Sequence, residues 1–167
     1  AIPLSNKIGK KNSFILSGSI CAVLSIFFFY IAPNQLELIF LINILISMSS
    51  ALVFPLIWAM YADISDYSEL STGRRATGLI FSSSSMSQKM GWTIGGAISG
   101  WILAAYGFAA NEIQTDQSIL GIRLMISFFA AAGALLSVGF MFLYPLSEKM
   151  MVNIQVELEE VRAKYTS

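Results

Sequence analysis

The sequence contains no histidine and a single cysteine, Cys21. One cysteine cannot form an intramolecular disulfide, and without histidine the chain cannot build an imidazole metal site or a histidine-based catalytic triad. Charge is scarce as well, because Asp, Glu, Lys and Arg make up 12% of the residues, whereas soluble domains carry about 25%. The net charge is zero, which leaves no basic field for nucleic acid. We therefore expect no metal, no cofactor, no catalytic residues and no nucleic-acid partner.

Long apolar runs fill most of the chain. Hydrophobic residues account for 56% of the sequence, the mean hydropathy is +0.70, and about 20 consecutive apolar residues suffice for a helix to cross a bilayer. Runs of about this length or longer predict spans at residues 13–31, 38–61, 77–108 and 122–144. The predicted fold class is all-α, a membrane helical bundle of four transmembrane helices within residues 1–146.

Residues 147–167 form a tail of a different kind. Met151, Ile154, Leu158 and Val161 recur at helical spacing, and charged residues occupy the other faces. The pattern predicts a short, cytoplasmic amphipathic helix. It either packs against the cytoplasmic surface of the protein or is simply solvated.

The distribution of basic residues indicates the orientation. Lys89 lies inside the third predicted span and Arg123 lies on one side of the membrane; the other eight fall on the opposite side, at Lys7, Lys10, Lys11, Arg74, Arg75, Lys149, Arg162 and Lys164. By the positive-inside rule we expect a multi-pass protein of the cell (inner) membrane with both ends of the chain in the cytoplasm. Because the chain begins at Ala1 without an initiator methionine or a signal-peptide pattern, we interpret it as a fragment of a longer protein.

Lys89 is the only charged residue between Arg75 and Glu112. It lies about 18 Å along a helix that begins at Thr77, near the middle of a hydrocarbon core about 30 Å thick, where a charge costs about 2.5–3.5 kcal/mol. Either the lysine faces a hydrophilic pathway with a carboxylate partner, or it snorkels to the interface. None of the four predicted spans contains a carboxylate, so a partner would come from helices outside this chain.

Small and polar residues surround Lys89 in the sequence. Ser82, Ser85 and Thr93 share its helical face, and Ser84 lies beside them. These hydroxyls are what the wall of a hydrophilic cavity needs, but interhelical hydrogen bonds explain the serines equally well. Two GxxxG pairs follow, Gly91 with Gly95 and Gly96 with Gly100, and they predict close helix packing.

Aromatic residues and charges end the second predicted span. Phe54, Trp58 and Tyr61 could stack on a ring-shaped solute or belong to the interfacial aromatic belt. Beyond them lies a charged connection with the carboxylates and guanidinium groups of Asp63, Asp66, Glu69, Arg74 and Arg75. A helix C-terminus disfavours negative charge, so the carboxylates need cations, and the two arginines lie across the Thr72-Gly73 turn. The alternative is a solvated loop, because exposed ion pairs contribute little.

The order of residues from Ala62 to Gly91 is more specific than composition. It reads Ala62-Asp63-x-x-Asp66-Tyr67-x-Glu69-x-x-Thr72-Gly73-Arg74-Arg75-Ala76-x-Gly78, then Ile80-Phe81-Ser82, then Gln88-Lys89-x-Gly91. This order resembles the glycoside-pentoside-hexuronide:cation symporters, sugar transporters of the major facilitator superfamily. The resemblance extends to Gly9-Lys10-Lys11 near the start and to Tyr144-Pro145-Leu146-Ser147 before the tail.

The resemblance implies a place for this chain and roles for its residues. Superfamily members have two six-span halves, and the Gly9-Lys10-Lys11 motif implies that the chain holds spans nine to twelve, with the N-terminal spans and the cation-site aspartates missing. It also implies that Lys89 lies beside the sugar and cation sites, that Ser84, Ser85 and Phe54 face the sugar, and that the connection closes the cytoplasmic side. Four positions depart from the commoner family pattern: Ser68, Leu70, Ser71 and Thr77. The family often has a lysine at position 71 and a glutamate at position 77, and the loss of these two charges thins the network.

Two functions from different classes remain. The first is the C-terminal part of a secondary active transporter that symports a sugar or glycoside with Na+ or H+ by alternating access, embedded in lipid and in contact with its own N-terminal spans. The second is a four-span scaffold or assembly subunit that pairs through the glycine stripe without transporting anything. A membrane enzyme is a weaker third, because no catalytic set is present.

Overall fold

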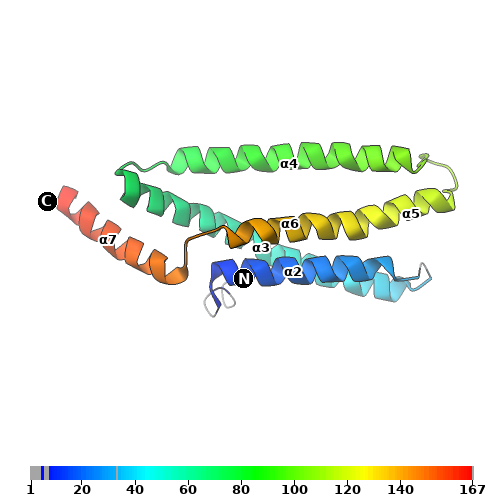
Figure 1. The fold of residues 1–167 in the computed structure, drawn as a ribbon, viewed down its shortest axis with the longest axis horizontal. Coiled ribbons are helices and arrows are strands. Elements are labelled where there is room, and N and C mark those ends of the chain that lie inside the picture. Colours follow the sequence, from blue (N-terminus) through cyan, green and yellow to red (C-terminus); the bar gives the residue numbers. More distant parts are fainter. Residues whose placement is uncertain (1–4, 6–7, 33, 167) are drawn as a thin grey trace.

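The computed structural model describes residues 5, 8–32 and 34–166, and every regular element in this part of the chain is a helix. In chain order the elements are α2 (Lys10–Phe29), α3 (Leu36–Thr72), α4 (Thr77–Ala105), α5 (Asp116–Leu124), the π-helical turn η1 (Met125–Phe129), α6 (Ala130–Phe142) and α7 (Glu148–Thr166). The elements α5, η1 and α6 follow one another without a break and form one rod (Figure 1). The predicted all-α class is confirmed.

Three helical segments in the described residues are long and apolar enough to cross a membrane. They are Lys10–Phe29, Leu36–Thr72 and the rod Asp116–Phe142. The 29 residues of α4 also exceed the hydrocarbon core in length, at about 1.5 Å per residue, but its serines and Lys89 make it more polar and it is not among the three. That α4 crosses the membrane stays a prediction.

The second predicted span is longer than the sequence pattern indicated. We expected a charged loop after residue 61, but α3 continues to Thr72 because residues 62–72 contain neither glycine nor proline. The helix ends at Gly73, whose φ of 68° is left-handed and whose N–H donates to the Glu69 carbonyl at 2.9 Å. Asp63, Asp66 and Glu69 therefore lie on the last turns of a helix, in fixed directions.

Helix α2 packs between α3 and α6. Its buried face consists mostly of small residues: Ser13, Phe14, Ser17, Gly18, Ala22 and Ser25. Small side chains let helix backbones approach closely, and a Cβ atom placed on Gly18 would lie only 2.6 Å from Val138 Cγ2 of α6. The close packing that we predicted at the α4 glycines is thus present between α2 and α6.

Helix α4 runs along one edge of the bundle and is joined to the rest at its two ends (Figure 1). At the first end Thr77 shares a hydrogen bond of 2.6 Å with Ser65 of α3. At the other end the Ser118 hydroxyl of α5 donates to the carbonyls of Tyr106 and Gly107 at 3.0 and 2.9 Å. None of the residues of α4 is buried, so its length remains open to contact.

The amphipathic tail forms α7 and packs against the end of α3. Leu146, Met151, Ile154 and Leu158 form a buried cluster against which Ile64, Leu70 and Tyr144 pack. Three of the four residues of the predicted stripe are in this cluster, whereas Val161 is 41% exposed. The structure thus places the apolar face of the tail on the charged end of α3.

Candidate transport site and charge network

Lys89 lies in a shallow hollow along α4. Ser82, Ser85, Met86, Met90, Thr93 and Ile94 line the hollow with it. The structure thus brings together the residues that helical periodicity placed on one face. The Lys89 side chain is exposed, and among the described residues no carboxylate lies within 4 Å of its ammonium group. The site therefore presents a positive charge beside hydroxyl groups, which suits an anionic or polyhydroxylated partner.

The hydroxyl groups of α4 bond to their own helix. Ser82 and Ser83 donate to the Leu79 carbonyl, and Ser84 donates to the Ile80 carbonyl at 2.7 Å. Such bonds satisfy a hydroxyl in an apolar surrounding without a second helix. The interhelical bonds considered from the sequence are absent at these three serines in the described part of the chain, and each hydroxyl oxygen can still accept a bond from a solute.

Aromatic rings join α3 to α4 near the Lys89 hollow. Trp58 stacks on Phe81 of α4 at 5.7 Å between ring centroids, and Tyr61 meets both rings edge-on at 5.8 and 6.2 Å. Trp58 thus uses one face on Phe81, while 40% of its surface stays exposed. Phe54, about one turn earlier on α3, is 57% exposed and offers an open ring surface.

The glycines of α4 face open space. A Cβ atom placed on Gly91, Gly95, Gly96 or Gly100 would have no described atom within 4 Å. Their role in helix packing stays a prediction, and any helix that uses them comes from outside the described residues.

Asp63 is the most buried carboxylate of the charged end of α3. It is 5% exposed, and the Lys10 ammonium group of α2 donates to both of its oxygens at 2.8 and 2.7 Å. The same lysine's backbone N–H donates to the Glu148 carboxylate at 2.7 Å, so the first residue of α7 caps the N-terminus of α2. A buried charge is costly unless it is paired, so these contacts explain how Asp63 is tolerated.

The two other carboxylates face the tail. Arg162 of α7 donates to both oxygens of Glu69 at 3.2 and 2.7 Å and lies 4.0 Å from Asp66. The carboxylate of Glu69 raises the pKa of Arg162 above its usual value, so the guanidinium group stays charged. Arg75 is a weaker neighbour of Glu69, at 3.7 Å.

The cation partners expected from the sequence are present only in part. Of the two arginines across the turn, Arg75 contacts Glu69 only loosely, and the Arg74 guanidinium has no described carboxylate within 4 Å. The main partners, Lys10 and Arg162, lie 53 and 93 residues away in the sequence. An antiparallel hairpin brings the start of one helix near the end of the next, and this signal would have pointed to Lys10. Nothing in the sequence alone singled out Arg162.

Two further cations tie α2 to the rod α5–η1–α6. The Lys11 ammonium group donates to the carbonyls of Phe142 and Tyr144 at 3.1 and 2.7 Å. At the opposite end Arg123 donates to the carbonyls of Phe29 and Ile31. Both sets of carbonyls belong to the last residue of a helix or lie just beyond it, where carbonyls have no partner within the helix. Each helix thus supplies the cation that caps the other.

The described residues contain no cluster of three or more Asp, Glu, Cys or His side chains that could hold a metal ion.

Comparison with known families shows what kind of protein carries this arrangement. The family described as MFS/sugar transport protein matches residues 1–148. This chain belongs to that family. The chain is therefore a member of a transporter family and not of an enzyme family.

Individual relatives indicate the branch of the family to which the chain belongs. The MFS chain is 33% identical over 153 residues to the "Glucuronide carrier protein homolog" of Escherichia coli, covering 92% of the chain and 34% of the relative. It is 31% identical over 162 residues to the "Isoprimeverose transporter" of Lactiplantibacillus pentosus, covering 96% and 33%. It is also 31% identical over 126 residues to the "Inner membrane symporter YicJ" of Escherichia coli, covering 75% and 27%. No solved structure matches the chain.

These matches confirm the family predicted from the residues 62–91. The MFS chain is a glycoside-pentoside-hexuronide:cation symporter family member and a multi-pass membrane protein. It spans about a third of the length of the curated relatives it matches. Membership in a transporter family favours the transporter over the four-span scaffold, the two functions that the sequence left open.

Proposed function

We propose that this chain is the C-terminal part of a secondary active transporter that symports a sugar or glycoside with Na+ or H+ by alternating access. The match of residues 1–148 to a sugar-transport family is the observation that carries the proposal. The names of two relatives, a glucuronide carrier homolog and an isoprimeverose transporter, favour a carbohydrate substrate. The helices α2, α3, α4 and the rod α5–η1–α6 would be spans nine to twelve, and the longer relatives have room for eight more.

In this proposal Lys89 links the sugar and cation sites. Its charge, exposed beside the hydroxyls of Ser85 and Thr93, pairs with a carboxylate on the N-terminal spans and responds when the coupling cation binds there. Ser84 and Ser85 offer hydroxyl groups to the sugar, and Phe54 offers a ring face. Trp58 acts on the same pathway through Phe81, on which it stacks. No cofactor is needed beyond the coupling cation.

The charged end of α3 serves as the cytoplasmic gate in this proposal. Asp63, Asp66, Glu69, Arg74 and Arg75 lie at the end of the bundle where Lys10 and Arg162 also gather. This concentration of basic residues supports a cytoplasmic position for both ends of the chain in the inner membrane. The carboxylates would exchange partners with the N-terminal half as the transporter opens and closes.

Substitution of Lys89 in the full-length transporter tests the proposal. Lys89→Ala is expected to abolish cation-driven sugar accumulation, because the electrostatic link between the two sites is gone. Exchange of sugar without a cation gradient should be less affected. Lys89→Arg, which keeps the charge, should retain part of the coupling. Wild-type accumulation by the Lys89→Ala protein, at an equal amount in the membrane, would contradict the role of this residue.

The position of the chain is tested separately by reading the native gene upstream of the codon for Ala1. About eight further spans, with aspartates in the first few, are expected. A start codon a few residues before Ala1 would leave a four-span protein and would favour the scaffold function instead.

A further inference from the structure

A cavity of about 620 Å³ opens where the first turns of α2 and α7 meet. Lys10, Lys11 and Asn12 of α2 and Ser147, Glu148 and Lys149 at the start of α7 line it. Two helix N-termini therefore converge on one space, and a helix N-terminus favours negative charge; at α2 the Glu148 carboxylate already accepts from the Lys10 N–H. None of the roles described above for the transport site uses this cavity.

The charges around the cavity do not cancel. The Lys10 ammonium group is neutralised by Asp63, whereas Glu148 accepts only from the uncharged backbone N–H of Lys10 and keeps its negative charge. Lys11 donates only to uncharged carbonyls, so it keeps its full charge. Lys149 is exposed and has no described carboxylate within 4 Å. The two lysines outweigh the Glu148 carboxylate and leave the cavity with one net positive charge.

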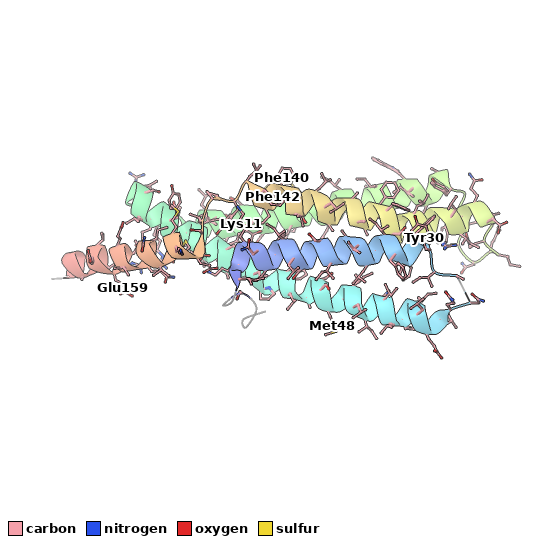
Figure 2. All side chains as sticks on the ribbon, turned by 60° about the horizontal axis from the view of Figure 1, so that its bottom comes forward. Lys11, Tyr30, Met48, Phe140, Phe142 and Glu159 are labelled. Carbon is pink, nitrogen blue, oxygen red and sulfur yellow. The ribbon has the colours of Figure 1, made fainter. Side chains whose placement is uncertain are left out.

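Exposed apolar surface lies at the end of α6 to which Lys11 of the cavity bonds. Lys11 bonds to the carbonyl of Phe142, and the Phe142 and Leu143 side chains are 65% and 77% exposed. In Figure 2 Lys11 lies at the end of α2 where Phe140 and Phe142 project from α6. A ligand that fits both surfaces has an anionic head and a hydrocarbon chain.

We propose that this cavity binds the headgroup of an anionic phospholipid of the phosphatidylglycerol type. The phosphate lies between Lys11 and Lys149, with the Asn12 amide and the Ser147 hydroxyl as further donors, and an acyl chain lies along Phe142 and Leu143. Basic pockets between membrane helices on the cytoplasmic side hold such headgroups, at about 1 kcal/mol per lysine near the surface. Inorganic phosphate shares the chemistry of the head but leaves the apolar rim uncovered.

Lipid binding to the intact, delipidated protein in detergent tests the proposal, and native mass spectrometry counts the bound molecules. Phosphatidylglycerol is expected to bind more tightly than phosphatidylethanolamine with the same acyl chains. Lys149→Gln should weaken phosphatidylglycerol binding about fivefold, the factor that corresponds to 1 kcal/mol. Lys164→Gln removes the same charge near the far end of α7 and should change binding less than twofold.

Four results would overturn the proposal. Equal binding of the two lipids, or equal effects of Lys149→Gln and Lys164→Gln, would show that no specific site exists. Displacement of phosphatidylglycerol by millimolar inorganic phosphate would show a site for a free anion instead. Lys11→Arg keeps both the charge and the bonds to the α6 end, so it should bind the lipid like the wild type; loss of binding would contradict the placement of the phosphate. These readouts do not depend on transport.

Discussion

Gly18 of α2 faces Val138 of α6, and the space for a side chain at this position is already occupied. A methyl group on Gly18 would lie 2.6 Å from Val138 Cγ2, and Val138 is only 7% exposed, so it has little freedom to move aside. Gly133, also in α6, is the opposite case, because no described atom lies within 4 Å of a Cβ atom placed there. A methyl group added at Gly18 therefore meets a filled space, whereas one added at Gly133 meets open space.

Gly18→Ala in the intact protein is expected to lower the free energy of unfolding by about 1–3 kcal/mol, the cost of overpacking a filled contact. Gly133→Ala should be neutral or slightly stabilising, because alanine loses less backbone entropy in a helix. Denaturant unfolding of both variants in the same detergent makes the comparison. Adding Val138→Ala should restore part of the loss in Gly18→Ala. A Gly18→Ala protein as stable as the wild type would mean that α2 and α6 are not in close contact here.

At the scale of helices, α2 and the rod α5–η1–α6 form an antiparallel pair held at both ends. Lys11 caps the end of α6, and Arg123 caps the end of α2. Arg123 also lies over the ring of Phe29, at 5.2 Å from its centroid, which adds a cation–π contact. The two caps are about 30 Å apart, the length of a 20-residue helix, so neither can compensate for the loss of the other.

Lys11→Gln and Arg123→Gln should each loosen the helix end that they cap, by about 0.5–2 kcal/mol. The larger effect is expected at Arg123, because its contact with the Phe29 ring is lost as well. Hydrogen exchange should show faster opening of the last turn of α6 in the first variant and of α2 in the second. In unfolding experiments the double variant should lose the sum of the two effects, because distant sites add. Strong non-additivity would contradict two independent caps.

Helices were predictable from this sequence, but their partners were not. Long apolar runs indicate a membrane helix wherever it packs, which is why α2, α3 and the rod were found. The end of α3 was misjudged because charged residues suggested a loop, although only Gly73 ends the helix. The packing face of α2 was overlooked because serines such as Ser17 are neither apolar nor GxxxG glycines. Helix packing alone brings Arg162 to Glu69, and a single sequence carries no record of it.

At the scale of the molecule, α7 packs beside the charged end of α3 and joins the tail to the proposed gate (Figure 1). Two kinds of contact hold it. Leu158 is 3% exposed in the apolar cluster, and truncating a buried leucine costs about 2–5 kcal/mol. The ion pair of Arg162 with Glu69 is solvent-exposed, with 46% of the arginine side chain accessible, and such pairs contribute little. The apolar contact should therefore hold α7 in place. The ion pair should mainly keep Glu69 from pairing with another cation.

This division predicts different results for two substitutions in the intact protein. Leu158→Ala should release α7, so that its backbone amides exchange as fast as those of an unpacked helix. Arg162→Gln should leave α7 protected but free Glu69 to pair with Arg75, which already lies 3.7 Å away. Raising the salt concentration should weaken the Arg162 contact and leave the protection of α7 almost unchanged, because salt screens exposed charges and not apolar contacts. If Arg162→Gln exposed α7 as fully as Leu158→Ala, electrostatic attraction and not apolar burial would hold the tail on the gate.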